Sequence, residues 1–325
     1  MEYINFGKAG LKVSRLAYGL GLRGQADEQE AQRVIERAID LGINLIDCAN
    51  IYSPTDDHSR PGRSEQILGR AILGKRDDVV ITSKVASPVG RGPNDRGLAR
   101  VHILREIDNS LRRLQTDYVD VYLVHIFDES TPLEETMAAL DTVVQSGKAR
   151  YVGCCNYKGW QVTKGQWIAD SRHLTPFMCI QNEYSLLQRT PEEELFGVAR
   201  DQGLGIMAYS PLAVGLLSGL YRRGKPAPDG TYWATRGRDR FEGYIDGPAG
   251  AVIEAVCAIA DEVGKTPAQV ALAWVLAHPE ITCAITGGDT IAHLEDNFGA
   301  LGWSLDAEHR ARLDAVSAPA PMYRP

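Results

Sequence analysis

Short apolar runs alternate with longer amphipathic segments along most of this chain. Eight of the runs are rich in Val, Ile and Tyr and lack a period-two alternation of apolar and polar residues. Continuous apolar runs of this kind are typical of strands that are buried on both faces of a sheet. The predicted strands are Leu16–Gly19, Asn44–Cys48, Val79–Lys84, Val119–His125, Tyr151–Cys155, Met178–Glu183, Gly205–Ser210 and Cys283–Thr286.

The segments between the strands have the spacing and the end signals of helices. Thr131, Thr190 and Thr266 each precede a proline, and Glu or Gln stands three residues after each threonine. In a capping box the Thr side chain accepts a hydrogen bond from the first turn, and proline occupies the first helical position. We therefore expect each Thr to cap a helix. The clearest helical segments are Glu28–Leu41, Ser64–Leu73, Val101–Leu114 and Pro132–Ser146.

Eight strands that alternate with helices predict a closed (β/α)8 barrel, an architecture that suits a chain of 325 residues. An open, doubly wound sheet is the alternative, because Gly19, Gly21 and Gly24 have the spacing of a dinucleotide-binding motif. The chain continues from these glycines into a new helix cap, and a glycine trio alone does not establish that fold. We therefore predict one barrel domain over residues 1–325.

Three segments extend this minimal barrel. Tyr3–Phe6 and Leu11–Val13 flank a turn with two glycines, which predicts an N-terminal β-hairpin. Residues 86–100 and 212–248 are long and rich in glycine, and we expect both to form irregular loops at the C-terminal mouth of the barrel. Long loops in compact domains often carry function.

The composition limits the classes of function. The chain is 44% hydrophobic and 24% charged, which excludes a disordered or coiled-coil protein. Its net charge of −7 does not favour nucleic acid or an anionic membrane as a partner. No apolar run approaches the roughly 20 residues that span a bilayer. The first residues also lack the basic and apolar regions of a signal peptide, so we expect a cytoplasmic location.

The six cysteines show neither a CxxC motif nor a Cys/His pairing at zinc spacing. Most of them lie in apolar, strand-like runs. We therefore expect reduced and mostly buried thiols, as in a cytosolic protein, and no metal site.

Ionisable side chains follow three consecutive predicted strands. The second strand ends in Asp47 and is followed by Tyr52, Lys84 ends the third strand, and His125 ends the fourth. These strand ends meet at the catalytic face of a (β/α)8 barrel. A Lys ammonium within ~4–6 Å lowers the pKa of a phenol, a carboxylate keeps the Lys protonated, and a neutral His orients a carbonyl oxygen. Each residue alone is compatible with a structural role, but together they predict a site for proton transfer.

Four segments give the sequence a resemblance to the aldo-keto reductases that spans nearly the whole chain. They are Gly42–Tyr52, Gly62–Gly69, Ile81–Lys84 and Asp117–His125. Residues 215–219 add a resemblance to the branch that includes channel β subunits and aryl-alcohol dehydrogenases. The resemblance implies that Asp47, Tyr52, Lys84 and His125 form the catalytic tetrad, with Tyr52 as the general acid/base.

The resemblance also implies a nicotinamide cofactor, NADP or NAD. Cys155, Asn156 and Gln181 match positions that hold the nicotinamide carboxamide, with Cys155 in place of the usual Ser. Tyr209 matches the aromatic ring that stacks on the nicotinamide. The implied diphosphate loop contains Ser210, Pro211, Leu212, Gly215, Leu217 and Ser218, and Gly19 and Asp47 complete this part of the site.

The segment after the last strand resembles the adenosine-binding motif less closely. Gly287, Asp289 and His293 stand where family members often have Lys or Arg for a 2′-phosphate, and the pair Asp296-Asn297 stands for Glu-Asn. An acid at position 289 would repel a 2′-phosphate and accept a hydrogen bond from a ribose hydroxyl. The family implies NADP and these residues favour NAD, so both remain open. Alternative cations in the long loop are Arg222, Arg223, Arg236, Arg238 and Arg240.

The predicted function is metal-free hydride transfer between the cofactor and a small carbonyl or alcohol substrate. Sugar, aryl and polycyclic substrates all remain possible. Phe127, Trp160, Trp233 and Tyr244 are candidates for the wall of the pocket, with packing as the alternative for each. A regulatory subunit on the same fold is a rival function, and the intact tetrad argues against it. The nicotinamide motifs argue against the other rival, a lyase or isomerase.

Overall fold

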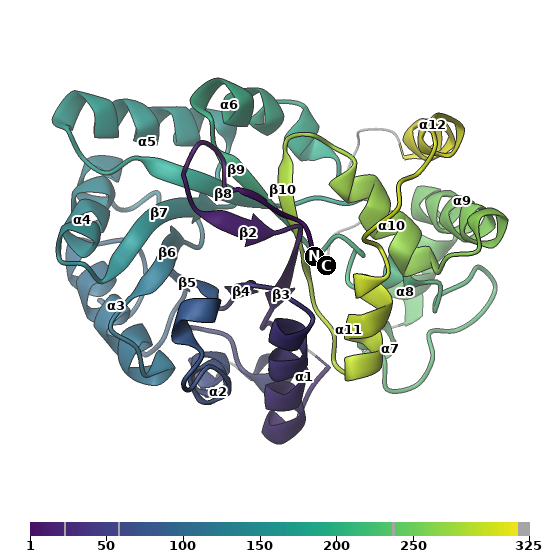
Figure 1. The fold of residues 1–325 in the computed structure, drawn as a ribbon, viewed down its shortest axis with the longest axis horizontal. Helices are drawn as coiled ribbons and strands as arrows, with labels where there is room; N and C mark the ends of the chain where they lie inside the picture. The colour runs from purple at the N-terminus through teal and green to yellow at the C-terminus, as the bar shows by residue number, and fades with distance from the viewer. Residues whose placement is uncertain (23, 58, 236–237, 318–325) are drawn as a thin grey trace.

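Parallel strands form a closed barrel in the computed structural model, which describes residues 1–22, 24–57, 59–235 and 238–317. The strand order around the barrel is β10-β3-β4-β5-β6-β7-β8-β9 (Figure 1). The strands are β3 (Leu16–Gly19), β4 (Leu45–Asp47), β5 (Val80–Val85), β6 (Val119–Val124), β7 (Ala149–Cys155), β8 (Phe177–Glu183), β9 (Gly205–Tyr209) and β10 (Ile281–Thr286). All eight predicted strands are confirmed, and the pairing of β10 with both β9 and β3 excludes the open sheet.

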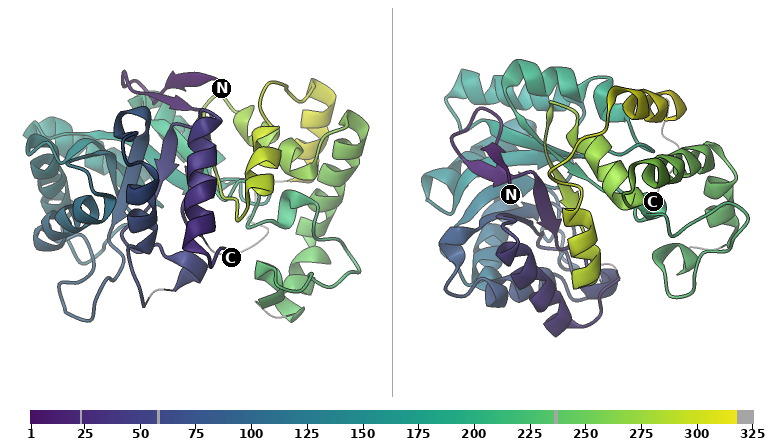
Figure 2. Two further views of the ribbon diagram at one scale, coloured as in Figure 1. Left: turned by 60° about the horizontal axis from the view of Figure 1, so that its bottom comes forward. Right: turned by 45° about the vertical axis from the view of Figure 1, so that its right-hand side comes forward.

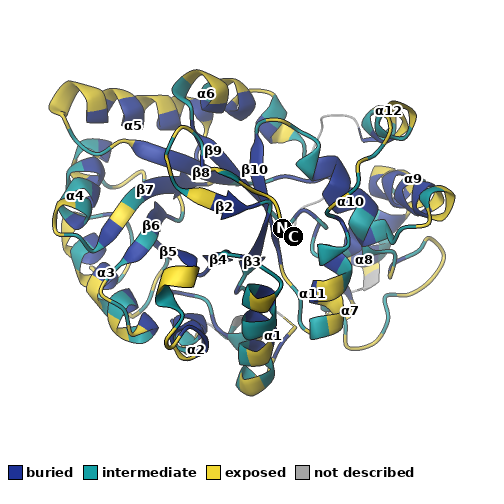
Figure 3. Cartoon of the chain, viewed as in Figure 1, coloured by how far each residue is buried: buried dark blue, intermediate teal, exposed yellow. Residues whose placement is uncertain are grey.

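Helices surround the barrel and bury the side that faces the strands. Figure 3 shows buried strands inside a ring of helices whose outer faces are exposed. In α1, for example, the buried residues Ala31, Val34, Ile35 and Ala38 recur every three or four positions. The helices of the ring and the C-terminal region are α1 (Glu28–Asp40), α2 (Arg63–Ala71), α3 (Arg100–Leu114), α4 (Leu133–Gln145), α5 (Gly159–Arg172), α6 (Leu195–Gln202), α9 (Pro248–Val263), α10 (Pro267–Leu276), α11 (Ile291–Phe298) and α12 (Ala307–Val316).

The predicted hairpin closes the N-terminal end of the barrel. Strands β1 (Tyr3–Asn5) and β2 (Lys12–Ser14) pair antiparallel, and Figure 2 shows them at the end opposite the long loops. Phe6 is fully buried and joins the apolar cluster inside the barrel. A Cβ at Gly205 would lie 2.3 Å from the Phe6 ring, so this close packing requires glycine at position 205.

The first and last strands of the barrel are joined by an arginine as well as by their ladder. Arg15 lies just before β3, and its guanidinium donates hydrogen bonds to the carbonyls of Leu276, Ile281 and Thr282. These carbonyls lie at the end of α10 and the start of β10. One side chain therefore fixes the seam at which the barrel closes.

Only one of the three predicted threonine caps is confirmed. Thr266 accepts a hydrogen bond from the first turn of α10 and forms the complete capping box. Thr131 instead donates to the carboxylate of Asp128 at 2.7 Å, which organises the loop before α4. Thr190 donates to the side chain of Gln188 and opens a short 3-10 turn. In the two segments without the predicted threonine cap, a nearby side-chain oxygen accepts the hydrogen bond of the threonine hydroxyl instead.

The two long segments follow β5 and β9, so they lie at the predicted C-terminal end. The segment 86–99 contains turns and bends, in agreement with the prediction. The segment 212–248 is not irregular throughout, because it contains a 3-10 turn (Leu216–Ser218) and the short helices α7 (Tyr232–Thr235) and α8 (Arg238–Ile245). Within the described ranges no single helix is long and apolar enough to cross a membrane, although Asp239–Ile245 and Pro248–Val263, bent by 61°, pass that test as a pair.

Candidate active site

The four side chains predicted at the barrel mouth lie in one hydrogen-bonded group. Lys84 Nζ donates to Asp47 Oδ2 at 2.6 Å and to the Tyr52 hydroxyl at 3.3 Å. The Tyr52 hydroxyl lies 3.4 Å from Nε2 of His125. They come from β4, the loop that follows it, β5 and the residue after β6. The barrel therefore brings together residues that are up to 78 positions apart, from Asp47 to His125.

Lys84 is at the centre of this group. Its side chain is fully buried, and its third hydrogen bond goes to the carbonyl of Cys48 at 2.9 Å. An ammonium has three donors, so Asp47, Cys48 and Tyr52 use all of them. Burial alone would lower the pKa of Lys84, but the nearby Asp47 and Tyr52 outweigh it, so the pKa lies above its ordinary value. Lys84 is therefore a permanent cation that donates to the oxygen of Tyr52.

The predicted lowering of the Tyr52 pKa is wrong in its net direction. Burial raises the pKa of the phenol, and this effect is larger than the opposing effect of the Lys84 charge. The lysine does act in the predicted sense. The phenol is therefore protonated at neutral pH, as a proton donor must be.

His125 is neutral, as predicted. Burial and then the charge of Lys84 lower its pKa to about 3. Its Nδ1 atom is buried and has no hydrogen-bond partner in the described part of the chain. Its ring meets the Tyr52 ring edge to face, with centroids 5.6 Å apart. The geometry leaves Nε2 and the Tyr52 hydroxyl side by side.

Two further side chains hold Asp47 in place. Its Oδ1 atom accepts from Thr82 Oγ1 at 2.5 Å and from Gln181 Nε2 at 2.9 Å. Thr82 was not among the residues predicted for the site. Strand alternation was the available signal, because Thr82 stands two residues before Lys84 and therefore faces the same side of β5. Gln181 was predicted as a cofactor residue, and its side-chain amide donates to Asp47 and to Met207 Sδ.

The other predicted nicotinamide residues lie on the adjacent strand ends. Asn156 N donates to the Gln181 carbonyl, and the Asn156 side chain bonds His125 O at 2.9 Å and the Tyr209 hydroxyl at 2.8 Å. Asn156 has a left-handed backbone, with a φ of 58°. Cys155 is fully buried and joins the apolar cluster inside the barrel. Asn156, Gln181 and Tyr209 thus form one polar wall beside the tetrad.

The predicted diphosphate loop has an unusual backbone. Ser210, Ala213 and Val214 have positive φ angles of 50–53°, and Gly215 and Gly219 are also left-handed. Consecutive turns of this kind point backbone amides into a concave anion site. The amides of Leu212 and Gly215 make no hydrogen bond among the described residues. These two donors fit a diphosphate.

The remaining loop residues have structural contacts. The amides of Leu217 and Ser218 bond the carbonyls of Leu212 and Gly215, and Pro211 is buried. Gly19 packs against β10, where a Cβ would lie 2.7 Å from Ile285 Cγ2.

Some of the residues after β10 that were predicted to bind the adenosine already make hydrogen bonds within the protein. The Asp296 carboxylate accepts from Thr266 and Gln269 in the first turn of α10, which ties α11 to α10. Asn297 is buried and donates to the Gly287 carbonyl at 3.3 Å. His293 is exposed.

Asp289 lies against the loop after β3. A Cβ at Gly24 would lie 2.1 Å from Asp289 Oδ2, and the Gln25 side chain donates to the Asp289 carbonyl at 2.6 Å. The loops after β3 and β10 thus meet at this acid.

The arginines of the long loop, which are the other candidates for phosphate binding, differ in their contacts. Arg223 donates to the carbonyls of Ile245 and Asp246 within its own segment, and the charge of Arg222 opposes the burial that raises the pKa of the Cys257 thiol. Arg240 also has an interaction partner. Arg236 and the side chain of Arg238 lie outside the described residues.

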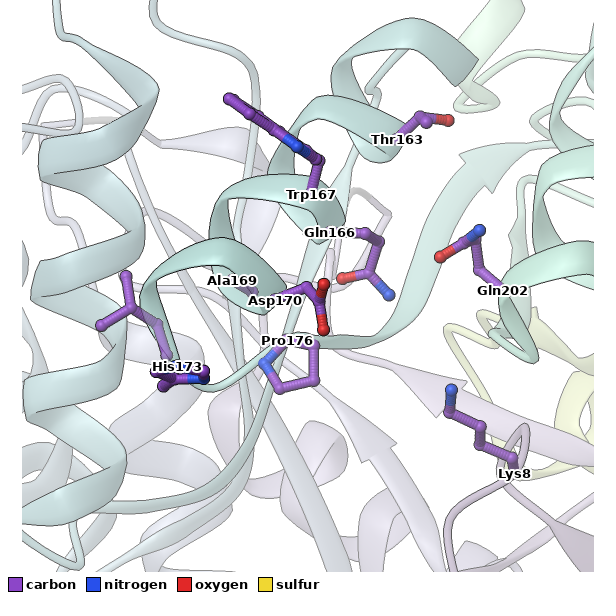
Figure 4. Close-up of a pocket in the computed structure, with 10 residues that line it drawn as sticks. Lys8, Thr163, Gln166, Trp167, Ala169, Asp170, His173, Pro176 and Gln202 are labelled. Atoms are coloured by element: carbon purple, nitrogen blue, oxygen red, sulfur yellow. The ribbon is translucent and has the colours of Figure 1, made fainter.

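A separate hollow of about 500 Å³ lies at the other end of the barrel, between α5, α6 and the hairpin turn (Figure 4). Trp167, Asp170 and Lys8 line it. The Gln166 amide in its wall bonds both backbone groups of Phe177 and is therefore structural. Catalytic groups of such barrels lie at the C-terminal ends of the strands, so this hollow is not the active site.

The fold agrees with the relatives of the chain. The sequence model of the Aldo/keto reductase family matches residues 15–318. The chain is 40% identical to an uncharacterized oxidoreductase, YrpG, of Bacillus subtilis (strain 168), covering 97% of this chain and 96% of that protein. It is 36% identical to a probable voltage-gated potassium channel subunit beta of Arabidopsis thaliana, with coverage of 93% and 91%.

A third relative carries a named activity. The chain is 32% identical to an L-glyceraldehyde 3-phosphate reductase of Escherichia coli O157:H7, with coverage of 97% and 92%. These matches cover 93–97% of this chain. The chain therefore belongs to the aldo/keto reductase family, and nicotinamide-dependent oxidoreduction is the general activity that this membership supports.

Proposed function

We propose that this protein reduces a carbonyl compound, or oxidises the corresponding alcohol, with Tyr52 as the general acid/base. The observation that carries the proposal is the position of the Tyr52 hydroxyl, 3.3 Å from Lys84 Nζ and 3.4 Å from His125 Nε2. One neighbour is a cation and the other a neutral imidazole. This is an environment for moving a proton at the phenol oxygen.

In the reduction, the carbonyl oxygen of the substrate accepts hydrogen bonds from Tyr52 and from His125 Nε2–H. The phenol then gives its proton to this oxygen as negative charge develops there. Lys84 donates to the tyrosine oxygen and stabilises the phenolate that remains. Asp47, held by Thr82 and Gln181, keeps the ammonium in place.

A nicotinamide cofactor, when bound, supplies or accepts the hydride. Asn156, Gln181 and Tyr209 would hold the nicotinamide, since they form the polar wall beside the tetrad. The free amides of Leu212 and Gly215 would take the diphosphate. NADP is the family's usual cofactor, whereas Asp289 favours NAD, and the cofactor preference is tested below.

We propose aromatic aldehydes and ketones as the first substrate class to examine. Phe127 stands two residues beyond His125 and packs against Trp160 and Tyr157, with ring centroids 5.8 and 5.2 Å away. Trp160 keeps 53% of its surface exposed, so it offers a flat apolar face. Trp233 is fully buried and belongs to the packing. The relative with a named activity acts on a phosphorylated aldehyde, so sugar aldehydes should be tested as substrates beside the aromatic ones.

The cytoplasm is the proposed compartment, because all six cysteines are free and buried. A regulatory role is the second candidate function, since two relatives are named as probable channel β subunits. The two functions differ in turnover: a regulatory protein binds NADPH without oxidising it when aldehydes are added.

The test is Tyr52→Phe. Turnover should fall by ~10²–10⁴-fold, the usual contribution of general acid catalysis, while the Kd for the cofactor stays within a few-fold. Tyr118→Phe is the matched control, because Tyr118 lies at the opposite end of the barrel and its hydroxyl bonds Asp77. Near-normal turnover in Tyr52→Phe would refute the mechanism.

A further inference from the structure

A second buried polar group lies outside the barrel wall, behind the catalytic loop. Asn50 Nδ2 donates to Glu106 Oε2 at 2.9 Å, and Asn109 Nδ2 donates to the other carboxylate oxygen at 2.6 Å. Arg113 Nη2 lies 3.8 Å from Glu106 Oε2. Asn50 is fully buried and Glu106 is 1% exposed. Helix α3 thus presents a buried carboxylate to the loop between β4 and α2.

The same loop carries Tyr52. Asn50 stands two residues after Cys48, whose carbonyl accepts from Lys84, and two residues before Tyr52. The Asn50 amide donates to the Lys84 carbonyl at 3.3 Å, and the Tyr52 amide donates to Ala49 O at 3.2 Å. The loop is therefore a short turn whose middle is attached to α3 by one side chain.

The orientation of the Asn50 side chain is set by the carboxylate. The amide oxygen of Asn50 cannot donate a hydrogen bond to a carboxylate, so the NH₂ group must face Glu106 and Oδ1 must face away. Oδ1 is buried and has no hydrogen-bond partner in the described part of the chain. A buried acceptor without a partner is unfavourable for stability. The bond to Glu106 therefore holds the Asn50 side chain in one orientation even though this leaves Oδ1 unpaired.

We propose that Glu106 is a positioning residue for Tyr52 and that it acts through Asn50. The Asn50–Glu106 bond fixes the turn, and the turn fixes the distance of the Tyr52 hydroxyl from Lys84 and His125. Small displacements of a catalytic group cost large factors in rate, up to about 10²-fold per ångström. This inference rests on the proposed role of Tyr52.

The first test removes the donor. Asn50→Ala should lower kcat for the reduction of an aromatic aldehyde by NADPH at least tenfold, with KM and the Kd for NADPH within about twofold. In a Tyr52→Phe background the same substitution should cause no further loss, measured in single turnovers at high enzyme concentration. A purely structural role predicts instead that the two losses multiply.

The second test exchanges donor and acceptor without changing size. Asn50→Asp sets a carboxylate against Glu106 and should be as slow as Asn50→Ala. Adding Glu106→Gln restores a bond in the opposite direction, from the new amide at position 106 to the new carboxylate at position 50, so most of the kcat should return. This pair also keeps the test decisive if Asn50→Ala does not fold.

Asn109→Ala is the control, because it removes the other donor to the same carboxylate and leaves the catalytic loop attached. It should lower the thermal stability and keep kcat. The inference is overturned if Asn50→Ala keeps kcat, if its loss multiplies with that of Tyr52→Phe, if the exchange restores no activity, or if Asn109→Ala is equally slow. If Tyr52→Phe alone keeps its turnover, the proposed function fails as well, and this variant separates the two failures.

Discussion

The indole of Trp233 donates a hydrogen bond to the carbonyl of Val214 at 3.0 Å. Trp233 is fully buried in α7, whereas Val214 lies in the left-handed loop after β9. A β-branched residue with positive φ is strained, typically by ~1–3 kcal/mol, so the surrounding structure must hold it there. The long segment after β9 thus supports the loop that is proposed to bind the diphosphate.

We therefore predict that Trp233→Phe weakens cofactor binding. The ring stays in its aromatic surroundings but the bond to Val214 is lost, which should lower the free energy of unfolding by ~1 kcal/mol. The Kd for NADPH, measured by fluorescence titration, should rise several-fold. Trp274→Phe is the control, because it breaks a similar indole bond to Asp314 in α12. Equal effects of both variants on the Kd would contradict the prediction.

Lys84→Met should abolish most of the activity and change its pH dependence. The Lys84 charge opposes the burial that raises the pKa of Tyr52, so its loss raises that pKa further. Alcohol oxidation needs the phenolate form of Tyr52, so the pH range in which its rate rises should move to higher pH. An unchanged profile would mean that Lys84 does not act on Tyr52.

The same substitution should also destabilise the fold, because it leaves Asp47 as a buried, unpaired charge. Breaking a buried ion pair from one side costs ~3–5 kcal/mol. Lys84→Met with Asp47→Asn removes both charges. This double variant should recover stability in urea titrations without recovering turnover.

The stability of the protein should decrease on acidification because of His125. Its pKa is about 3 in the folded protein and ~6.5 when unfolded, so only the unfolded state binds a proton between these values. Stability is therefore constant above about pH 6.5 and falls below it, by ~1.4 kcal/mol per pH unit for one proton. Burial also lowers the pKa values of His102 and His278, which add to the slope.

His125→Gln should reduce the slope of stability against pH by the contribution of one proton, ~1.4 kcal/mol per pH unit. The measurement is the free energy of unfolding by urea between pH 4.5 and pH 7, and His173→Gln, at an exposed position, is the control. An identical slope in His125→Gln would show that the folded state takes up the proton.

Asp289→Arg should move the cofactor preference toward NADP. The substitution removes a repulsion and brings a cation to the 2′-phosphate, and a charged hydrogen bond is worth ~1.5–3 kcal/mol. The NADP/NAD ratio of dissociation constants should change at least tenfold, and Asp289→Asn should give a smaller change in the same direction. If neither variant changes the ratio, Asp289 serves only the contact with Gly24 and Gln25.

The barrel and the grouping of polar side chains at its mouth were predictable because both faces of each strand are buried. Buried strands leave continuous apolar runs, so an abrupt Asp47, Lys84 or His125 at the end of a run is conspicuous in the sequence. Hydrogen bonds between individual side chains leave no such signal in the sequence. The sequence did not indicate that Asp128 would take the hydroxyl of Thr131, or that Gln181 would bond Asp47.

The net pKa shift of Tyr52 was mispredicted for a similar reason. The sequence identified its charged neighbour, Lys84, but the depth of burial depends on every element around the site. The short helices α7 and α8 were also missed, because the segment 212–248 is rich in glycine and arginine and the helices are held by tertiary contacts such as the Trp233 bond.

The seam at Arg15 has a consequence for the order of synthesis. A ribosome makes β10 after the other seven strands of the barrel, yet β10 is the partner of both β3 and β9. Until Ile281–Thr286 has emerged, the nascent sheet has two unpaired edges, and Arg15 lacks its carbonyl acceptors. Unpaired edges of apolar strands invite association with other chains. Translation that stalls before this strand has emerged would therefore leave an open sheet that associates with other chains, so the need for chaperones should last until β10 has been made.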